Sequence, residues 1–247
     1  MDAIIVENLH KKFVLHHDRA KSLKRMFTSF KRSPVETYHV LKGINFTVKR
    51  GETLAIIGRN GSGKSTMLGM IARIYKPDEG SITVNGRIAP LLELGAGFHP
   101  DLSGTENVFL NASILGLKQK EIEKRYDAIV NFSELAAFID SPIRTYSSGM
   151  IARLGFAIAV HTDPDILLVD EVLGVGDASF QEKCENKIRQ IKDEGKTIIF
   201  VSHSPGAVRS VSTRALWLDS GLVRMDGDVE TVLDAYLDTQ GTHLENH

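Results

Sequence analysis

One glycine-rich stretch, residues 58–65, constrains the fold of this chain more than any other feature. It reads GRNGSGKS, a full P-loop pattern, and it follows the apolar run 53–57, which is typical of a strand buried on both faces. A helix is predicted directly after it, over residues 65–74. The strand before it and the helix after it favour an α/β fold over a glycine turn that matches by accident.

The same stretch predicts a site for a polyphosphate. Its glycines let the backbone curl so that successive N–H groups point at phosphate oxygens, and the positive end of the following helix adds to the attraction. Lys64 is expected to hold the β- and γ-phosphates, and the Ser65 hydroxyl to bind Mg²⁺. The residues expected to bind the nucleotide here are Gly58, Asn60, Gly61, Ser62, Gly63, Lys64, Ser65 and Thr66.

Two acids follow a second buried strand. The wholly apolar run 166–169 leads into Asp170 and Glu171, and acids in such a place are costly unless they have a task at the strand's carboxyl end. Asp170 is expected to hold magnesium through its water shell, and Glu171 to polarise the attacking water beside the γ-phosphate. The alternative is that Glu171 is a helix N-cap neighbour or a solvated strand end.

The remaining periodicities predict a mixed α/β chain without repeats or long linkers. Strands are predicted over residues 4–6, 44–48, 81–84, 88–92, 197–201, 215–218 and 222–225, the last two as a hairpin. Helices are predicted over residues 118–132, 148–161, 178–194 and 229–237.

One segment near the start is unusually basic. Residues 11–32 carry eight Lys or Arg side chains against one acid, and apolar residues recur at helical spacing from Leu23 to Phe30. This pattern predicts a basic amphipathic helix. A helix at a membrane surface and a solvated basic helix with one apolar face are both compatible with it.

The composition excludes several classes of protein. The 30 Lys and Arg residues nearly cancel the 31 Asp and Glu residues, so the overall field gives no reason to expect nucleic-acid binding. The single cysteine allows no internal disulfide and favours a reducing cytoplasm. The start has no secretory signal pattern, and no apolar stretch approaches the roughly 20 residues of a membrane span. The chain is therefore expected to be soluble by itself, with any membrane role supplied by a partner.

A third element points to a family. Residues 146–150, YSSGM, precede the apolar helix of residues 148–161, and His203 follows the buried strand of residues 197–201. By itself the serine-rich turn would be an ordinary helix cap. The order P-loop, serine-rich helix start, Asp-Glu strand and histidine resembles the ABC ATPase cassette, from about residue 4 to residue 237.

The resemblance implies a P-loop α/β fold with a mixed β core and a helical subdomain. A single ABC ATPase domain would span about 1–240, with the core over about 1–105 and 164–240, the helical subdomain over about 106–163 and a basic helical insertion over about 14–33. It also implies two copies facing head to tail, with the ATP of one subunit capped by the other. The capping residues would be Ser147, Ser148 and Gly149.

The resemblance gives further residues their roles. His203 would contact the γ-phosphate and form the catalytic set with Glu171 and Lys64, while Asp177 would link the two sites across the dimer. Tyr38 would stack on the adenine, unless it is an ordinary tyrosine at a strand edge.

Departures from the usual ABC cassette sequence indicate which branch of the family this chain resembles. Tyr146 and Ser148 replace the usual leucine and glycine, and Glu93 or Leu94 stands where a glutamine is usual. Together with the sequences of residues 92–98 and 171–177, these departures resemble those of the ATP-binding subunits of bacterial exporters of O-antigen, capsule and teichoic acid. Among these, O-antigen export is the first choice. Some such exporters carry a C-terminal sugar-binding domain, so a chain ending at residue 247 is expected to be of the kind without it or a piece of a longer protein.

That branch implies cofactors, partners and a location. ATP and Mg²⁺ would be the cofactors, and a homodimer would sit on a dimer of integral-membrane permease subunits that moves a lipid-linked polysaccharide. The chain would lie peripherally on the cytoplasmic face of the bacterial inner membrane, its basic helix guarding the entry of the glycan, and would bind no nucleic acid. The rivals are a soluble ABC ATPase of translation or DNA repair, a P-loop kinase for a small molecule, and a non-hydrolytic regulatory subunit.

Overall fold

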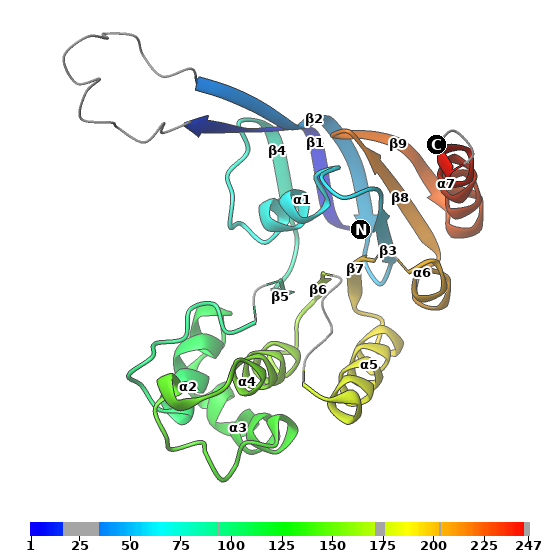
Figure 1. The fold of residues 1–247 in the computed structure, drawn as a ribbon. Helices are drawn as coiled ribbons and strands as arrows, with labels where there is room; N and C mark the ends of the chain where they lie inside the picture. Colours follow the sequence, from blue (N-terminus) through cyan, green and yellow to red (C-terminus); the bar gives the residue numbers. More distant parts are fainter. Residues whose placement is uncertain (17–34, 93, 171–175, 203, 245–247) are drawn as a thin grey trace, which may run out of the picture.

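The computed structural model describes residues 1–16, 35–92, 94–170, 176–202 and 204–244. A body of two β-sheets with helices around them carries a lobe of helices on one side, and the N-terminal hairpin projects from the body (Figure 1). The predictions for Glu93, Glu171 and His203 lie outside the described residues, as does most of the predicted basic helix.

A six-stranded sheet forms the centre of the body. Its strand order is β5-β6-β7-β3-β8-β9, with all neighbours parallel except the β8–β9 pair. The strands are β3 (Thr53–Ile57), β5 (Ile88–Leu91), β6 (Ile166–Val169), β7 (Thr197–Val201), β8 (Arg214–Asp219) and β9 (Leu222–Asp228). Every residue of β3, β6 and β7 is buried, which confirms the predicted buried strands.

The burial of these strands follows from a separate hydrophobic core on each face of the sheet. Successive side chains of a strand point to opposite faces, and so Leu54 belongs to one core while Ala55 belongs to the other. One core lies between the sheet, the second sheet and helix α1 (Lys64–Ile71), and the other lies under helices α5 (Ala178–Asp193) and α7 (Val229–Leu244). This sheet therefore holds the ends of its strands in a fixed arrangement.

The second sheet is antiparallel, in the order β2-β1-β4. Its strands are β1 (Asp2–His16), β2 (Val35–Lys49) and β4 (Glu79–Val84). Residues 11–16, at the start of the basic segment, continue β1 rather than forming a helix, and the bounds of the predicted insertion stay a prediction. Residues 11–16 pair with the start of β2, where Phe13 lies opposite Tyr38.

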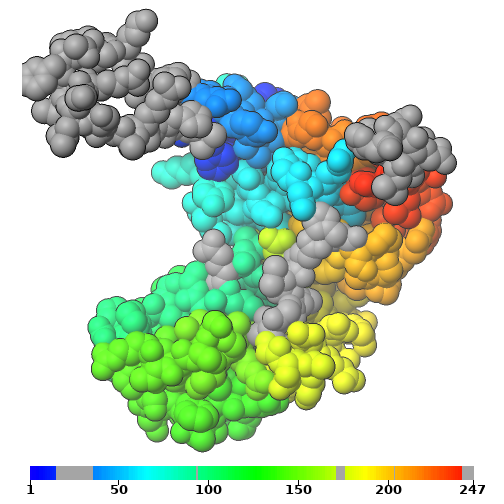
Figure 2. Space-filling model, viewed as in Figure 1, coloured from blue at the N-terminus to red at the C-terminus, as the bar shows by residue number. Residues whose placement is uncertain are grey.

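Three helices, α2, α3 and α4, form a lobe with its own hydrophobic core. The helices of the described chain are α1 (Lys64–Ile71), α2 (Gly104–Ile114), α3 (Gln119–Ser133), α4 (Ser148–Val160), α5 (Ala178–Asp193), α6 (Pro205–Val211) and α7 (Val229–Leu244), with a 3-10 turn η2 (Ile143–Thr145). Figure 2 shows the green surface of the lobe adjoining the yellow surface of α5. The lobe matches the predicted helical subdomain in kind, while its bounds stay a prediction.

Some helix boundaries differ from the predictions. Helix α1 ends at Ile71 rather than Ile74, since Arg73 takes a positive φ of 64° that ends a right-handed helix. Helix α7 continues past Leu237, to Leu244. Within the described ranges, no helix combines the length and the apolar character that crossing a bilayer requires.

Cys184, on the buried face of α5, gives a simple test of this packing. Its side chain is fully buried, and this burial raises the pKa of its thiol to about 12. Because only the thiolate reacts, we expect the folded chain to react with iodoacetamide at pH 8 at least about 100-fold more slowly than the chain in denaturant. Mass spectrometry can follow the reaction without ambiguity, since this is the single cysteine. Equal rates in the two states would contradict the buried position.

Candidate functional site

The P-loop takes a backbone conformation that requires glycine at two positions. Gly58 and Gly63 have φ angles of 149° and 104°. A Cβ atom on Gly58 would lie 2.1 Å from the Leu218 carbonyl oxygen, and one on Gly63 would lie 2.7 Å from a methyl carbon of Leu41. The loop is therefore pressed against β8 and β2, and no other residue fits at either position.

The start of α1 favours a negatively charged ligand. Gly63 is the N-cap residue and makes no side-chain capping hydrogen bond, and the first turn contains no acid. Lys64, of which 6% is exposed, donates from Nζ to the carbonyl oxygens of Gly58 at 2.8 Å and Arg59 at 3.0 Å. A positive charge and the N–H groups of a helix N-terminus thus meet at one point, as phosphate binding requires.

A cavity of about 470 Å³ opens above this loop. The predicted site residues on its wall are Tyr38, Asn60, Gly61, Gly63, Lys64, Ser65, Thr66 and Asp170. Gly58 and Ser62 do not line it, and the hydroxyl of Ser62 is buried with no hydrogen-bond partner among the described residues. The fold thus brings the P-loop and the end of β6 to one cavity, although more than 100 residues separate them in the sequence.

Ser65 and Asp170 fit the binding of Mg²⁺. Both line the main cavity and also an adjoining one of about 160 Å³. Mg²⁺ prefers oxygen ligands and usually keeps waters and phosphate oxygens beside one or two protein groups. One hydroxyl and one carboxylate beside the phosphate-binding loop meet that requirement.

The serine-rich turn, residues 147–149, lies elsewhere. Ser147 is the N-cap of α4, and its Oγ accepts a hydrogen bond of 3.2 Å from the Met150 N–H. Ser147 and Ser148 are exposed, and none of the three residues lines the cavity at the P-loop. They belong to the helical lobe, apart from α1 in Figure 1. One copy of the chain does not bring this turn to its own P-loop.

Comparison with known families decides the membership of the chain. The sequence model described as "ABC transporter" matches residues 41–174, more than half of the 247 residues. The matched region contains the P-loop, the serine-rich turn and Asp170. The chain belongs to the ABC transporter family. The resemblance seen in the sequence is thereby confirmed.

Relatives of this ABC protein are similar over nearly its whole length. The O-antigen export system ATP-binding protein RfbB of Klebsiella pneumoniae is 47% identical over 233 residues, which cover 93% of this chain and 95% of that protein. The teichoic acids export ATP-binding protein TagH of Shouchella clausii is 43% identical, over 95% of this chain and 65% of that protein. A dimeric structure of MJ0796, a bacterial ABC transporter cassette, is 25% identical with a TM-score of 0.70, over 92% of this chain and 98% of that chain. The predicted cassette fold is confirmed.

Asp177 of the ABC protein lies at the N-terminus of α5, away from the cavity wall. Its Oδ1 accepts from the Phe180 N–H at 3.0 Å, and its Oδ2 lies 3.0 Å from Nη2 of Arg153. The Phe180 N–H and the Arg153 guanidinium lower the pKa of Asp177. The structure therefore ties this predicted linking residue to α4, the helix that begins at the serine-rich turn.

One aromatic residue of the cavity wall, Phe13 of β1, was not predicted from the sequence. It lies opposite Tyr38 across the β1–β2 pair and makes an edge-to-face contact with Tyr75 at 5.8 Å between ring centroids. Tyr38 itself is 60% exposed. The signal that could have identified Phe13 is the strand pairing of residues 11–16, which the basic helical pattern obscured.

The stretch where a glutamine is usual packs tightly against α4. A Cβ atom on Gly155 would lie 2.7 Å from the Gly95 N atom, and one on Gly95 would lie 2.3 Å from Cγ2 of Ile151. Leu94, in the turn after β5, packs against the core beneath the large sheet. At Gly155, the backbone of α4 therefore touches the turn that follows β5, with no side chain between them.

Proposed function

We propose that this ABC protein is the ATP-binding and ATP-hydrolysing subunit of a transporter that exports a lipid-linked polysaccharide, O-antigen first. The observation that carries the ATPase is that Lys64, Ser65 and Asp170 line one cavity. The identity of 47% to the Klebsiella RfbB protein, over almost the full length of both chains, supports the polysaccharide cargo.

In this proposal the phosphates of ATP lie on the P-loop. The N–H groups at the start of α1 and the Lys64 ammonium hold the β- and γ-phosphates. Ser65 and Asp170 would hold Mg²⁺, which would neutralise phosphate charge. Glu171 accepts a proton from the attacking water and His203 contacts the γ-phosphate, roles that the family resemblance gives them. Hydrolysis then depends mainly on positioning and charge stabilisation.

The site is completed by a second copy of the chain. Residues 147–149 lie apart from their own P-loop and present the N-terminus of α4, which suits the phosphates of a nucleotide bound to another subunit. The dimeric form of the MJ0796 cassette supports this arrangement. ATP closes the two subunits head to tail, and closure acts on a dimer of integral-membrane permease subunits. The chain lies peripherally on the cytoplasmic face of the bacterial inner membrane and binds no nucleic acid.

Phe13 and Tyr38 offer two aromatic rings to the adenine. We expect Phe13 to stack on the base more strongly, because its contact with Tyr75 already orders the ring, whereas Tyr38 is largely exposed. Phe13→Ala should therefore weaken ATP binding by about 1–3 kcal/mol, roughly 5- to 150-fold, and Tyr38→Ala by less.

Inorganic triphosphate separates stacking from damage to the loop. Its affinity, measured by calorimetry, should be the same for both variants and the parent, since it carries no base. A loss of triphosphate binding in Phe13→Ala would show that the ring supports the P-loop rather than the base. A larger loss of ATP binding in Tyr38→Ala would return the stacking role to Tyr38.

Affinity purification from membranes of the source cell tests the transport function. We expect the tagged chain to recover a multi-span membrane protein and a lipid-linked glycan, which mass spectrometry would identify. Recovery of ribosomes or DNA-repair proteins instead would overturn the export function and leave the ATPase. Phosphate release from ATP without any added acceptor should accompany the first result, and its absence would favour a kinase.

A further inference from the structure

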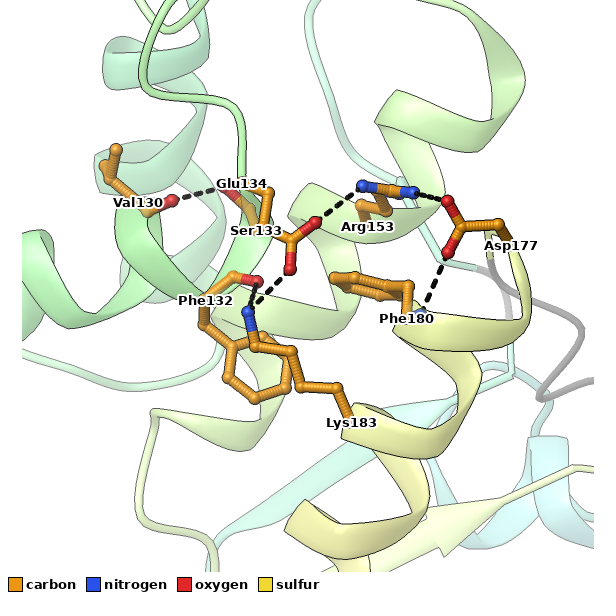
Figure 3. A network of polar contacts seen from close by, with 8 residues as sticks. All are labelled: Val130, Phe132, Ser133, Glu134, Arg153, Asp177, Phe180 and Lys183. Atoms are coloured by element: carbon orange, nitrogen blue, oxygen red, sulfur yellow. Dashed lines mark hydrogen bonds and ion pairs between the residues drawn. The ribbon is translucent and has the colours of Figure 1, made fainter.

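Three helices meet at the side chain of Arg153, which the proposed catalytic chemistry does not use. Arg153 lies six residues after Ser147, less than two turns into α4. Its Nη1 lies 3.0 Å from Oε2 of Glu134, at the end of α3, and its Nη2 lies 3.0 Å from Oδ2 of Asp177, at the start of α5. Figure 3 shows the guanidinium between the two carboxylates. One side chain thus connects all three helices.

Aromatic and ionic contacts hold this arrangement in one geometry. The Arg153 guanidinium lies 4.7 Å from the centroid of the Phe180 ring, and only 19% of the arginine side chain is exposed. The second oxygen of Glu134 lies 2.9 Å from Nζ of Lys183, which also donates to the Phe132 carbonyl oxygen. The planar fork of an arginine suits such a two-carboxylate site, and a lysine cannot reproduce it.

Asp177 divides its two oxygens between separate tasks. Oδ1 caps α5 through the Phe180 N–H, and Oδ2 receives Arg153. The carboxylate side chain is 68% exposed. Ion pairs of such exposed groups contribute little to stability, so the geometry of the Arg153 network matters more than its strength.

We propose that Arg153 is a positioning residue that holds Asp177 and residues 147–149 in one fixed arrangement, so that both reach the partner subunit together. The proposal rests on the ATP-bound dimer of the proposed function. In the dimer, residues 147–149 cap the partner's nucleotide and Asp177 lies in the loop that links the two sites. Residues 147–149 and Asp177 belong to different elements of one subunit, and the ion pair of Arg153 with Asp177 connects those elements.

The test compares Arg153→Gln with the same substitution at a second arginine, Arg209. Arg209 of α6 also bridges two carboxylates, Glu230 at 2.8 Å and Asp234 at 3.0 Å, on α7. Each substitution is made in the Glu171→Gln background, where ATP and Mg²⁺ are expected to trap the dimer. Dimerisation is measured by analytical ultracentrifugation, ATP affinity of the dilute subunit by calorimetry, and kcat and KM in the background with native Glu171.

We expect Arg153→Gln to weaken ATP-dependent dimerisation at least tenfold and to lower kcat at least tenfold, with subunit ATP affinity within twofold of the parent. Arg153→Lys should recover part of both losses, because lysine reaches one carboxylate at a time, and Arg209→Gln should change neither. Asp177→Asn should weaken dimerisation as Arg153→Gln does, and the double variant should be no worse than either single one.

Each other result is informative. Normal dimerisation and kcat in Arg153→Gln would overturn the proposal and leave the dimer mechanism intact. Failure of the Glu171→Gln parent to dimerise with ATP would overturn the dimer mechanism and the Arg153 proposal with it. A loss of subunit ATP affinity in Arg153→Gln would show that Arg153 acts on its own nucleotide site. Equal losses of dimerisation and kcat in Arg209→Gln would show a general effect on folding. Either result would overturn the proposal. If Arg153→Gln fails to fold, the partial loss expected of Arg153→Lys decides the question.

Discussion

A Glu171→Gln variant should bind ATP with near-parental affinity, lose its turnover and accumulate as a closed dimer. Glu171 follows Asp170 at the carboxyl end of β6, and Asp170 lines the nucleotide cavity. An amide is nearly the same size as a carboxylate but cannot accept a proton from water. A general base contributes a factor of about 10²–10⁴ to a rate, so ATP hydrolysis should fall by at least about 100-fold.

Phosphate release and size-exclusion chromatography with ATP and Mg²⁺ measure the two effects. Glu182→Gln is the matched control, since Glu182 is an exposed acid on the neighbouring helix α5 and does not line the cavity. This control should hydrolyse ATP like the parent. Normal hydrolysis by Glu171→Gln would mean that another group takes the proton, and the base assignment would then be wrong.

The parts of the fold that the sequence predicted well are those determined by local burial. Strands β6 and β7 have the predicted bounds because every residue in them is buried. The P-loop and Asp170 were predicted to serve one nucleotide because each follows a buried strand, and they line one cavity.

The parts that the sequence did not predict depend on distant partners or on short capping signals. Residues 11–16 form a strand because they pair with the start of β2, which a local helical pattern cannot reveal. Helix α2 was missed although Ser103 and Glu106 form a capping box at its start. Helix α6 was missed because Pro205 and Gly206 are typical of loops, whereas a proline also fits the first turn of a helix.

The candidate site shows the same division. The glycines and Lys64 of the P-loop are contiguous, so their task could be inferred from the sequence. Phe13 reaches the cavity only through the β1–β2 register, and Arg153 gains its partners only where α3, α4 and α5 meet. Such residues are found from packing, since no fixed spacing along the chain connects them.

A Lys64→Ala variant should lose most of its affinity for ATP and all measurable ATP hydrolysis. The Lys64 ammonium is buried at the base of the cavity, held by the carbonyl oxygens of Gly58 and Arg59. Hydrogen bonds between charged groups contribute about 1.5–3 kcal/mol each, so loss of the contact with the β- and γ-phosphates should weaken ATP binding roughly 10- to 150-fold. The rise in Tm that ATP and Mg²⁺ give the parent should shrink accordingly.

Arg59→Ala is the control for this experiment, because Arg59 belongs to the same loop and carries the same charge but is exposed and off the cavity wall. It should keep ATP binding and the ATP-dependent rise in Tm close to the parent's. AMP, which lacks the β- and γ-phosphates, should bind Lys64→Ala and the parent equally. An undiminished rise in Tm with ATP in Lys64→Ala would contradict the phosphate role of Lys64. An equal loss of AMP binding would instead mean that the substitution distorts the P-loop, since without the ammonium the carbonyl oxygens of Gly58 and Arg59 lose their donor.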